Sequence, residues 1–429
     1  MGFQSGAAPG HPAAVTAATA YTSRERSLIL TFAIVGALIE SMELNLLSFP
    51  LTDLAASFAV STQSVVGVIT LQSLASIAGG FLFGWIADRW GRKASYVIFT
   101  AMYSIAAVVG GFAQDYTTFT LTRAIAGLAM GGAFGVIFAM FAESWKSRKR
   151  GFMGAVLQGM FIAGTLITQV VLYTTISALG SDTGWHTGFI AIGFGCLIIA
   201  GTAALWLPES KVWLAAKDEA GATGETAAAP VRARPDKGVI RGAVFLTLTT
   251  TGVFAASYSY ITFAPTYLRE TAGVSLTAST IILTVGTLLG IASYVVAGTL
   301  SDRIGRRRAT LYASVVGVVA FGAFAFADTG SPTVAVIALM GPAIGYAGFG
   351  VLGTWISEFY PTRYRAFGSN ATYYVARGIG SGLFPLGAVA LAGGDLHIAL
   401  ALGGVGALVG LVGCLFVQDT ADRVISAGS

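Results

Sequence analysis

Charge and cysteine are both scarce in this chain. Only 10% of its 429 residues are Asp, Glu, Lys or Arg, against roughly 25% in ordinary soluble domains. The two cysteines, Cys196 and Cys414, lie in separate apolar stretches, and the three histidines form no cluster. This spacing favours neither a metal site nor a redox motif, so both cysteines are expected to be small packing residues. With 55% hydrophobic residues and a mean hydropathy of +0.75, the composition indicates a membrane protein.

The signatures of nucleotide-driven and catalytic chemistry are also absent from the sequence. No Walker-type G-x-x-x-x-G-K-[S/T] motif occurs, which removes the usual handle for ATP. No Ser, Cys or His constellation supports an enzyme. Gly127, Gly131, Gly132 and Gly135 lie in an apolar run with no preceding strand, so helix packing explains them better than a nucleotide loop does. We therefore expect no cofactor and no metal, and an ion gradient as the energy source.

The apolar residues fall into twelve runs, each long enough for a membrane-spanning helix of about 20 residues. They approximately cover residues 28–49, 63–87, 94–113, 117–142, 152–176, 187–207, 241–267, 275–300, 308–327, 332–357, 367–392 and 395–417. A linker of mixed Ala, Gly, Glu, Pro and Arg separates six runs from six. The expected fold is an all-α membrane protein with a tail at 1–27, a six-helix bundle at 28–207, the linker at 208–240, a second six-helix bundle at 241–417 and a tail at 418–429.

Two short motifs occur once in each half of the chain. GWIADRWGRK at residues 84–93 returns 214 residues later as GTLSDRIGRR at 298–307. Glu143, in ESWKSRKRG, returns 215 residues later as Glu358, in SEFYPTRYRAFG, and the two arginines that follow each glutamate keep their spacing. Two repeats in register indicate that the bundles are related by internal duplication, as in many transporters.

The repeated G-x-x-x-D-R-x-G-R-R loop resembles the signature of the major facilitator superfamily, and the resemblance covers nearly the whole chain. PESKVWL at residues 208–214 resembles the P-E-S-x-x-W-L of sugar porters and aromatic-acid/proton symporters. ESME at residues 40–43 is similar to the D-G-[F/Y]-D of the second group, with Glu in place of both Asp and no middle glycine. The resemblance implies a secondary transporter that works by alternating access.

The resemblance also implies a gate. In the family, the loop Asp sits near the N-terminus of helix 11, where the helix dipole favours an anion. We expect Asp88, with Arg89 and Arg92, to form a cytoplasmic latch that exists only while that side is closed, and Asp302 to repeat it with a smaller effect. The acidic residues of the second repeated motif complete the gating set: Glu143 and Glu358.

Four ionisable residues lie inside the predicted spans and away from their ends: Glu40, Glu43, Arg123 and Arg377. A charge at such depth is costly unless it is paired or hydrated, so these residues usually serve function. Glu43 and Arg123 each lie about 9 Å from the outer end of their helix at 1.5 Å per residue, so they can meet. They form either a fixed ion pair or one that opens when the carboxylate takes a proton, and the resemblance favours the second.

Glu40 lies one helical turn from Glu43, on nearly the same face. Two carboxylates so close disfavour ionisation of both, which suits proton coupling. We expect Glu43 to carry the proton, Arg123 to be its partner and Glu40 to modulate the pair.

One face of the eleventh run is polar. Asn370, Tyr373, Tyr374 and Arg377 follow i, i+3, i+4 and i+7 spacing, and Arg377 falls near the membrane midplane, where transporter sites tend to lie. Its planar fork of donors suits a carboxylate, although it could instead bind backbone carbonyls of a neighbouring helix. Tyr258 in the seventh run is expected on the opposite wall. These residues predict proton symport of a small organic anion, a monocarboxylate or aromatic carboxylate; the alternative is a sugar or polyol.

The basic residues predict the orientation. Of the 25 Lys and Arg, all except Arg123, Arg269 and Arg377 fall in the two tails or in the loops that follow the second, fourth, sixth, eighth and tenth runs. Because such residues favour the cytoplasmic side, both termini are expected to be cytoplasmic, in a cell inner or plasma membrane. This bias accounts for the net charge of +5 without nucleic acid. We expect a monomer whose partners are its substrate, protons and the bilayer.

Cysteine labelling tests this topology. In a variant without native cysteines, a cysteine placed in the 208–240 linker should resist an impermeant maleimide added outside intact cells and react after permeabilisation, since the linker is expected inside. Labelling from outside would contradict the orientation of both bundles.

Overall fold

The computed structural model describes residues 20–47, 50–145, 150–222, 236–327 and 331–420, and every regular element within these ranges is a helix. Twelve of the described helices or helix pairs are long and apolar enough to cross a membrane, which confirms the twelve predicted spans. The first begins at Ser23, earlier than expected, because Thr22 caps it: its side chain accepts a hydrogen bond from the Glu25 backbone N–H.

The first bundle contains six spans, and its fourth span is broken at Gly131–Gly132. A short helix, α3 (Leu51–Ser57), lies between the first two spans. The spans are α2 (Ser23–Asn45), α4 (Thr62–Trp90), α5 (Arg92–Gly111), α6 (Tyr116–Met130) with α7 (Ala133–Ser144), α8 (Arg150–Leu179) and α9 (Ser181–Trp206).

The second bundle repeats this order with more irregular helices. The first three spans are α11 (Lys237–Thr266) with η1 (Tyr267–Thr271), α12 (Leu276–Ile304) and α13 (Arg306–Ala325). The fourth span consists of α14 (Pro332–Ile344), η2 (Gly345–Gly348) and α15 (Phe349–Phe359), and the fifth of η3 (Thr362–Tyr364), α16 (Arg365–Arg377), η4 (Gly378–Leu383) and α17 (Phe384–Leu391). The sixth span consists of α18 (Leu396–Ala401) and α19 (Gly403–Cys414). Within the predicted linker, the described part forms α10 (Lys211–Ala222), while Arg232 lies outside the described residues.

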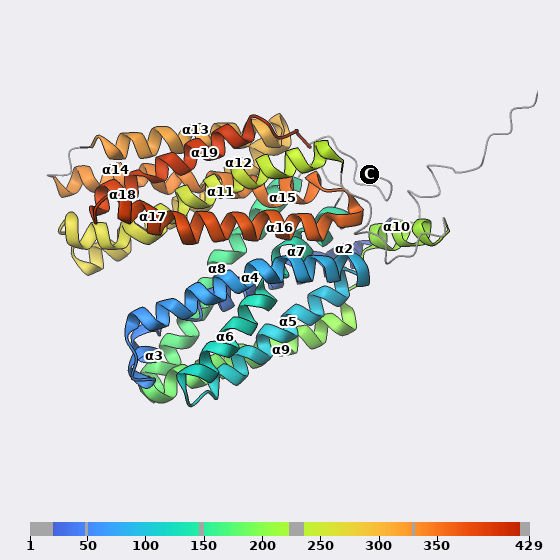
Figure 1. Ribbon diagram of the computed structural model, residues 1–429, viewed down its shortest axis with the longest axis horizontal. Helices are drawn as coiled ribbons and strands as arrows, with labels where there is room; N and C mark the ends of the chain where they lie inside the picture. Colours follow the sequence, from blue (N-terminus) through green and yellow to red (C-terminus); the bar gives the residue numbers. More distant parts are fainter. Residues whose placement is uncertain (1–19, 48–49, 146–149, 223–235, 328–330, 421–429) are drawn as a thin grey trace, which may run out of the picture.

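The two bundles converge at the end of the molecule where α10 lies and diverge toward α3 and α17 (Figure 1). The α4–α5 and α12–α13 loops and the starts of α8 and α16 lie at the converging end, which we call the basic end because of their arginines. We call the other end distal. Lys146 and Arg148, expected in a loop at the basic end, lie outside the described residues.

The repeated loops have the same backbone in both halves. α4 ends at Trp90 and α5 begins at Arg92, with Gly91 between them at φ 107°; Gly305 takes the same place between α12 and α13 at φ 95°. A positive φ of this kind favours glycine, which explains why both copies of the motif carry one at this position.

Each repeated aspartate holds the start of a helix in the other bundle. Asp88 accepts hydrogen bonds from the backbone N–H groups of Ala366 (3.3 Å) and Phe367 (2.9 Å) at the start of α16. Asp302 accepts from Gly151 (2.7 Å) and Phe152 at the start of α8. A helix N-terminus offers unpaired N–H groups and a favourable dipole, so these two contacts close the basic end from both sides.

A buried charge cluster surrounds the first of these contacts. The Arg92 guanidinium is fully buried and pairs with Asp88 at 3.1 Å and Glu143 at 3.2 Å. Glu143 also pairs, at 2.8 Å, with Arg365 of the other bundle. Arg92 donates a further hydrogen bond across the interface to the Thr362 carbonyl, at 2.9 Å. The cluster therefore contains two arginines and two acids drawn from both halves.

The second contact also has a buried arginine beside its aspartate. Arg306 pairs with Asp302 at 2.7 Å and with Glu358 at 3.1 Å. The structure places Arg89 outside either cluster: its guanidinium lies over the Trp85 ring of its own helix, 5.3 Å from the centroid. Arg89 therefore does not contribute to the contacts of the latch, contrary to the prediction.

A third repeat escaped sequence comparison because the residue types differ. Glu209 accepts hydrogen bonds from the backbone N–H groups of Arg92 and Lys93 at the start of α5. Asp419 does the same for Arg306 and Arg307 at the start of α13. Burial raises the pKa of Glu209 above its ordinary value, and the backbone donors and the Arg92 charge oppose that shift.

Asp88→Asn should shift the protein toward a state that is open at the basic end. The change removes the negative charge of Asp88 from the buried Arg92, and a buried charge that loses a partner is destabilising. Losing a charge-assisted bond costs about 1.5–3 kcal/mol, so the open population should rise at least about tenfold. The measurement is the distance between spin labels at Leu205 and Val412, which are exposed near the basic ends of α9 and α19.

Asp302→Asn is the matched control, and it should have a smaller effect. It leaves the Arg306–Glu358 ion pair in place. An unchanged label distance in Asp88→Asn would rule out the latch.

Candidate functional site

A cavity of about 500 Å³ lies between the two bundles. It reaches from Tyr373 and Arg377 toward the distal end, where Asn45, Ser73 and Ser381 line it. The contacts at the basic end close the opposite route. The remaining lining residues are Ser41, Leu44, Ile69, Gln158, Phe161, Thr165, Phe254, Tyr258, Ile261, Thr287, Tyr294, Phe349 and Gly382.

Arg377 is the cation on the wall of this cavity. It ends α16, directly before the π-helical segment η4, and its side chain is only 6% exposed. Its nearest acidic neighbour is Glu40, whose Oε1 lies 3.7 Å from Nη1, a distance too long for a hydrogen bond. Within the described part of the chain, no hydrogen bond holds the guanidinium. These contacts therefore do not support the alternative in which Arg377 binds backbone carbonyls of a neighbouring helix.

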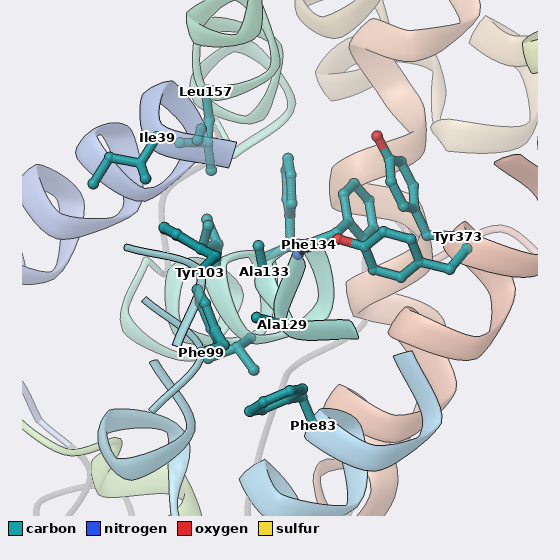
Figure 2. Packing of buried hydrophobic residues seen from close by; sticks show 14 of the residues in the cluster. Ile39, Phe83, Phe99, Tyr103, Ala129, Ala133, Phe134, Leu157 and Tyr373 are labelled. Atoms are coloured by element: carbon teal, nitrogen blue, oxygen red, sulfur yellow. Dashed lines mark hydrogen bonds between the residues drawn. The ribbon is translucent and has the colours of Figure 1, made fainter. Parts of the chain in front are cut away.

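Aromatic rings form the wall beside Arg377. The Tyr373 ring stacks on Phe134 of the other bundle, with centroids 3.5 Å apart and an angle of 9° (Figure 2). Phe254 packs edge-on against Tyr373 at 5.2 Å and lies 5.9 Å from the Tyr258 ring. Tyr258 and Tyr373 thus line the cavity from α11 and α16. Tyr258 lies on the same wall as Arg377, and not on the opposite wall as the sequence predicted.

A polar wall faces them, and the sequence reasoning missed it. Asn45 donates from its amide to the Ser41 carbonyl at 2.8 Å and to the Thr165 hydroxyl at 3.0 Å. The Gln158 side-chain oxygen is buried and has no hydrogen-bond partner among the described residues. The sequence pattern that could have revealed this wall is the spacing of Gln158 and Thr165, which lie seven residues apart on one face of an apolar run.

Asn370 and Tyr374 do not line the cavity. They contact the break between α6 and α7, where helix ends leave backbone groups unpaired. The Asn370 Oδ1 accepts from the Gly135 N–H at 2.5 Å, and the Tyr374 hydroxyl lies 2.5 Å from the Met130 carbonyl oxygen. The expected polar face of α16 therefore has two uses: Tyr373 and Arg377 face the cavity, and Asn370 and Tyr374 join the bundles.

The predicted meeting of Glu43 and Arg123 is confirmed. Arg123 Nη1 lies 2.7 Å from Glu43 Oε1, and its Nη2 donates to the Ala106 carbonyl at 2.7 Å. Phe119 and Phe189 lie against the guanidinium, 5.9 and 5.3 Å from it. Both side chains are buried, and neither lines the cavity. A pair so enclosed is costly to break by removing one partner, so its protonation state can influence how α2 and α6 pack.

A match to a known protein family agrees with the internal repeat found in the sequence. The profile described as Major Facilitator Superfamily matches residues 31–385. Most of both bundles falls within this match.

Two curated relatives carry names that refer to organic-acid transport. The probable 4-methylmuconolactone transporter of Cupriavidus pinatubonensis is 26% identical over 353 residues, covering 81% of this chain and 79% of the relative. The cis,cis-muconate transport protein of Acinetobacter baylyi is 24% identical over 416 residues, covering 93% of this chain and 98% of the relative.

A solved structure has the same fold. A proton:xylose symporter bound to 6-bromo-6-deoxy-D-glucose superposes with a TM-score of 0.77 over 94% of this chain and 98% of that one. At 18% identity, this likeness concerns the fold.

Proposed function

Because the chain belongs to the major facilitator superfamily, we propose that it is a secondary transporter that carries a small organic anion together with protons. It is a multi-pass membrane transport protein and not an enzyme. The substrate class that we favour is a monocarboxylate or an aromatic carboxylate. The observation that carries this proposal is the buried guanidinium of Arg377 on the cavity wall, free of hydrogen bonds within the described residues.

A guanidinium that is buried without hydrogen bonds calls for an anion. Its planar fork can bind both oxygens of a carboxylate, and such bonds are stronger than neutral ones. Tyr373 and Tyr258 place aromatic surface beside the cation, which suits a flat organic acid. The names of the two relatives refer to a muconolactone and to a muconate, so they support the broader class of organic acids.

A sugar or polyol is the second candidate, and the polar wall is what favours it. Asn45, Gln158 and Thr165 offer amide and hydroxyl groups of the kind that bind sugar hydroxyls. A sugar would leave Arg377 without an anionic partner, which is why we rank this candidate second.

We assign the basic end to the cytoplasm, in a cell inner or plasma membrane, because of its arginines. The conformation would then be closed inside, with its cavity directed outward. Proton coupling is assigned to Glu43, with Arg123 as the partner released when the carboxylate is protonated. We expect the protein to act as a monomer, with the proton gradient as its energy source and no cofactor.

Arg377→Ala and Arg377→Lys should both weaken binding of a carboxylate substrate. A charge-assisted bond contributes about 1.5–3 kcal/mol, so losing a bidentate contact should cost about tenfold to a hundredfold in affinity. Lysine keeps the charge but loses the planar fork. The measurement is equilibrium binding of the best ligand from a thermal-shift screen of carboxylates and sugars.

Arg241→Ala is the matched control for these variants. Arg241 is an exposed arginine on α11, beside Phe245, and it does not line the cavity. Its loss should leave affinity unchanged. Equal affinity in wild type and both Arg377 variants would remove the carboxylate hypothesis and favour the sugar.

Glu43→Gln should stop proton-driven accumulation while exchange of substrate across the membrane continues. The amide cannot ionise, so the Arg123 pair no longer responds to protons. The measurement is uptake into proteoliposomes with and without a pH gradient, beside counterflow. Uphill uptake retained in Glu43→Gln would refute this assignment.

A further inference from the structure

The Tyr374 hydroxyl has more oxygen neighbours than its single proton can serve. It lies 2.5 Å from the Met130 carbonyl oxygen and 2.9 Å from Glu40 Oε1. The Phe134 backbone N–H approaches the same hydroxyl oxygen at 3.4 Å. A carbonyl oxygen only accepts hydrogen bonds, and an ionised carboxylate also only accepts. One hydroxyl proton therefore faces two acceptors from two helices.

The chemistry of the two acceptors decides where that proton lies. The Met130 carbonyl can never supply a proton to its contact, whereas a protonated Glu40 carboxyl can, so the Tyr374 hydroxyl donates to Met130. The 2.9 Å contact is then a hydrogen bond only if Glu40 supplies the proton and Tyr374 accepts it. The tyrosine oxygen has two lone pairs, enough for Glu40 and for the Phe134 N–H. All three contacts are satisfied together only when Glu40 is a neutral acid.

The surroundings of Glu40 agree with a neutral acid. Its side chain is fully buried, and its Oε2 has no hydrogen-bond partner among the described residues. An unpaired buried oxygen costs less on a neutral carboxyl than on a carboxylate. Arg377 stays at 3.7 Å and does not close a hydrogen bond with it. The other titratable groups around Glu40 are Tyr373 and Tyr374 on α16, Tyr103 on α5, and Glu43 with Arg123 one turn away.

We propose that Glu40 is a second protonation site, and that the Tyr374 hydroxyl holds the two bundles together at the α6–α7 break only while Glu40 is protonated. We call this contact of Tyr374 with Glu40 and Met130 the lock. The inference rests on the proposed proton coupling and deepens it. When Glu40 ionises, it competes with Met130 for the tyrosine proton and draws Arg377 toward itself, so the contact between α16 and the break weakens. A protonated carrier without substrate is thus held closed at the basic end, which prevents protons from crossing alone.

The lock has no counterpart in the other half. At the repeat offset of 215 residues, the positions that correspond to Asn370 and Tyr374 are Ala155 and Gly159 on α8. Neither residue has a side chain that can hydrogen-bond to the opposing helix break. Within the part of the chain that the structure describes, the aspartate contacts are duplicated, whereas the proton-sensitive contact is present once, on the side that carries Glu40.

The test is the label distance between Leu205 and Val412 at low and at high pH, without substrate, in a background with Cys196 and Cys414 replaced by Ala. Wild type should shift toward the open distance at high pH by about tenfold in population, which corresponds to about 1.4 kcal/mol. Glu40→Gln should stay closed at both pH values, because the amide N–H donates to Tyr374 as the acid does. Tyr374→Phe should lose the pH response.

One control makes the result specific. Tyr96→Phe removes another buried hydroxyl, which donates to the Phe32 carbonyl within one bundle, and it should respond to pH as wild type does. The proposal is overturned if wild type shows no response, if Glu40→Gln or Tyr374→Phe keeps it, or if Tyr96→Phe loses it.

Uptake measurements separate this inference from the proposed function. Proton-driven uptake that is absent while the label distance still responds to pH would count against the proposed function alone. Normal uptake with no response of the label distance would count against the lock alone.

Discussion

A charge inside the bilayer needs a partner, and the central part of this structure follows from that constraint. Glu43 meets Arg123 within the first bundle, while Glu40 and Arg377 face each other across the two bundles. The first pair is tight and closed by aromatic rings. The second is long, and it leaves a guanidinium beside a cavity. This difference separates a pair that holds helices together from a pair that has room for a ligand.

At the basic end, buried charges also have partners, but the partners are of a different kind. There, the partners of the buried acids are arginines and helix N-termini, and both are supplied across the interface. Because these contacts need the bundles to be close, they exist only in a conformation closed at that end. The cavity and the closed end are therefore two aspects of one arrangement, in which the bundles converge on one side and diverge on the other (Figure 1).

Duplication explains the symmetry of the scaffold but not of the site. The aspartate contacts, the arginines beneath them and the caps by Glu209 and Asp419 occur in both halves. The central charges do not: Glu40 and Glu43 lie only in the first half and Arg377 only in the second.

The sequence by itself determined the class of protein, the twelve spans, the repeat and the pairing of Glu43 with Arg123. These follow from composition and from position along a helix, where depth increases by a constant rise per residue. Only the tertiary structure decided which face of α16 meets the cavity, because that depends on how the helix is rotated against the α6–α7 break. For this reason Tyr373 and Tyr374, adjacent in sequence, have different surroundings: Tyr373 lines the cavity, and Tyr374 binds Glu40 and Met130. Arg89 and the polar wall at Gln158 were misjudged or missed for the same reason, since the direction of a side chain on a helix is set by what packs against it.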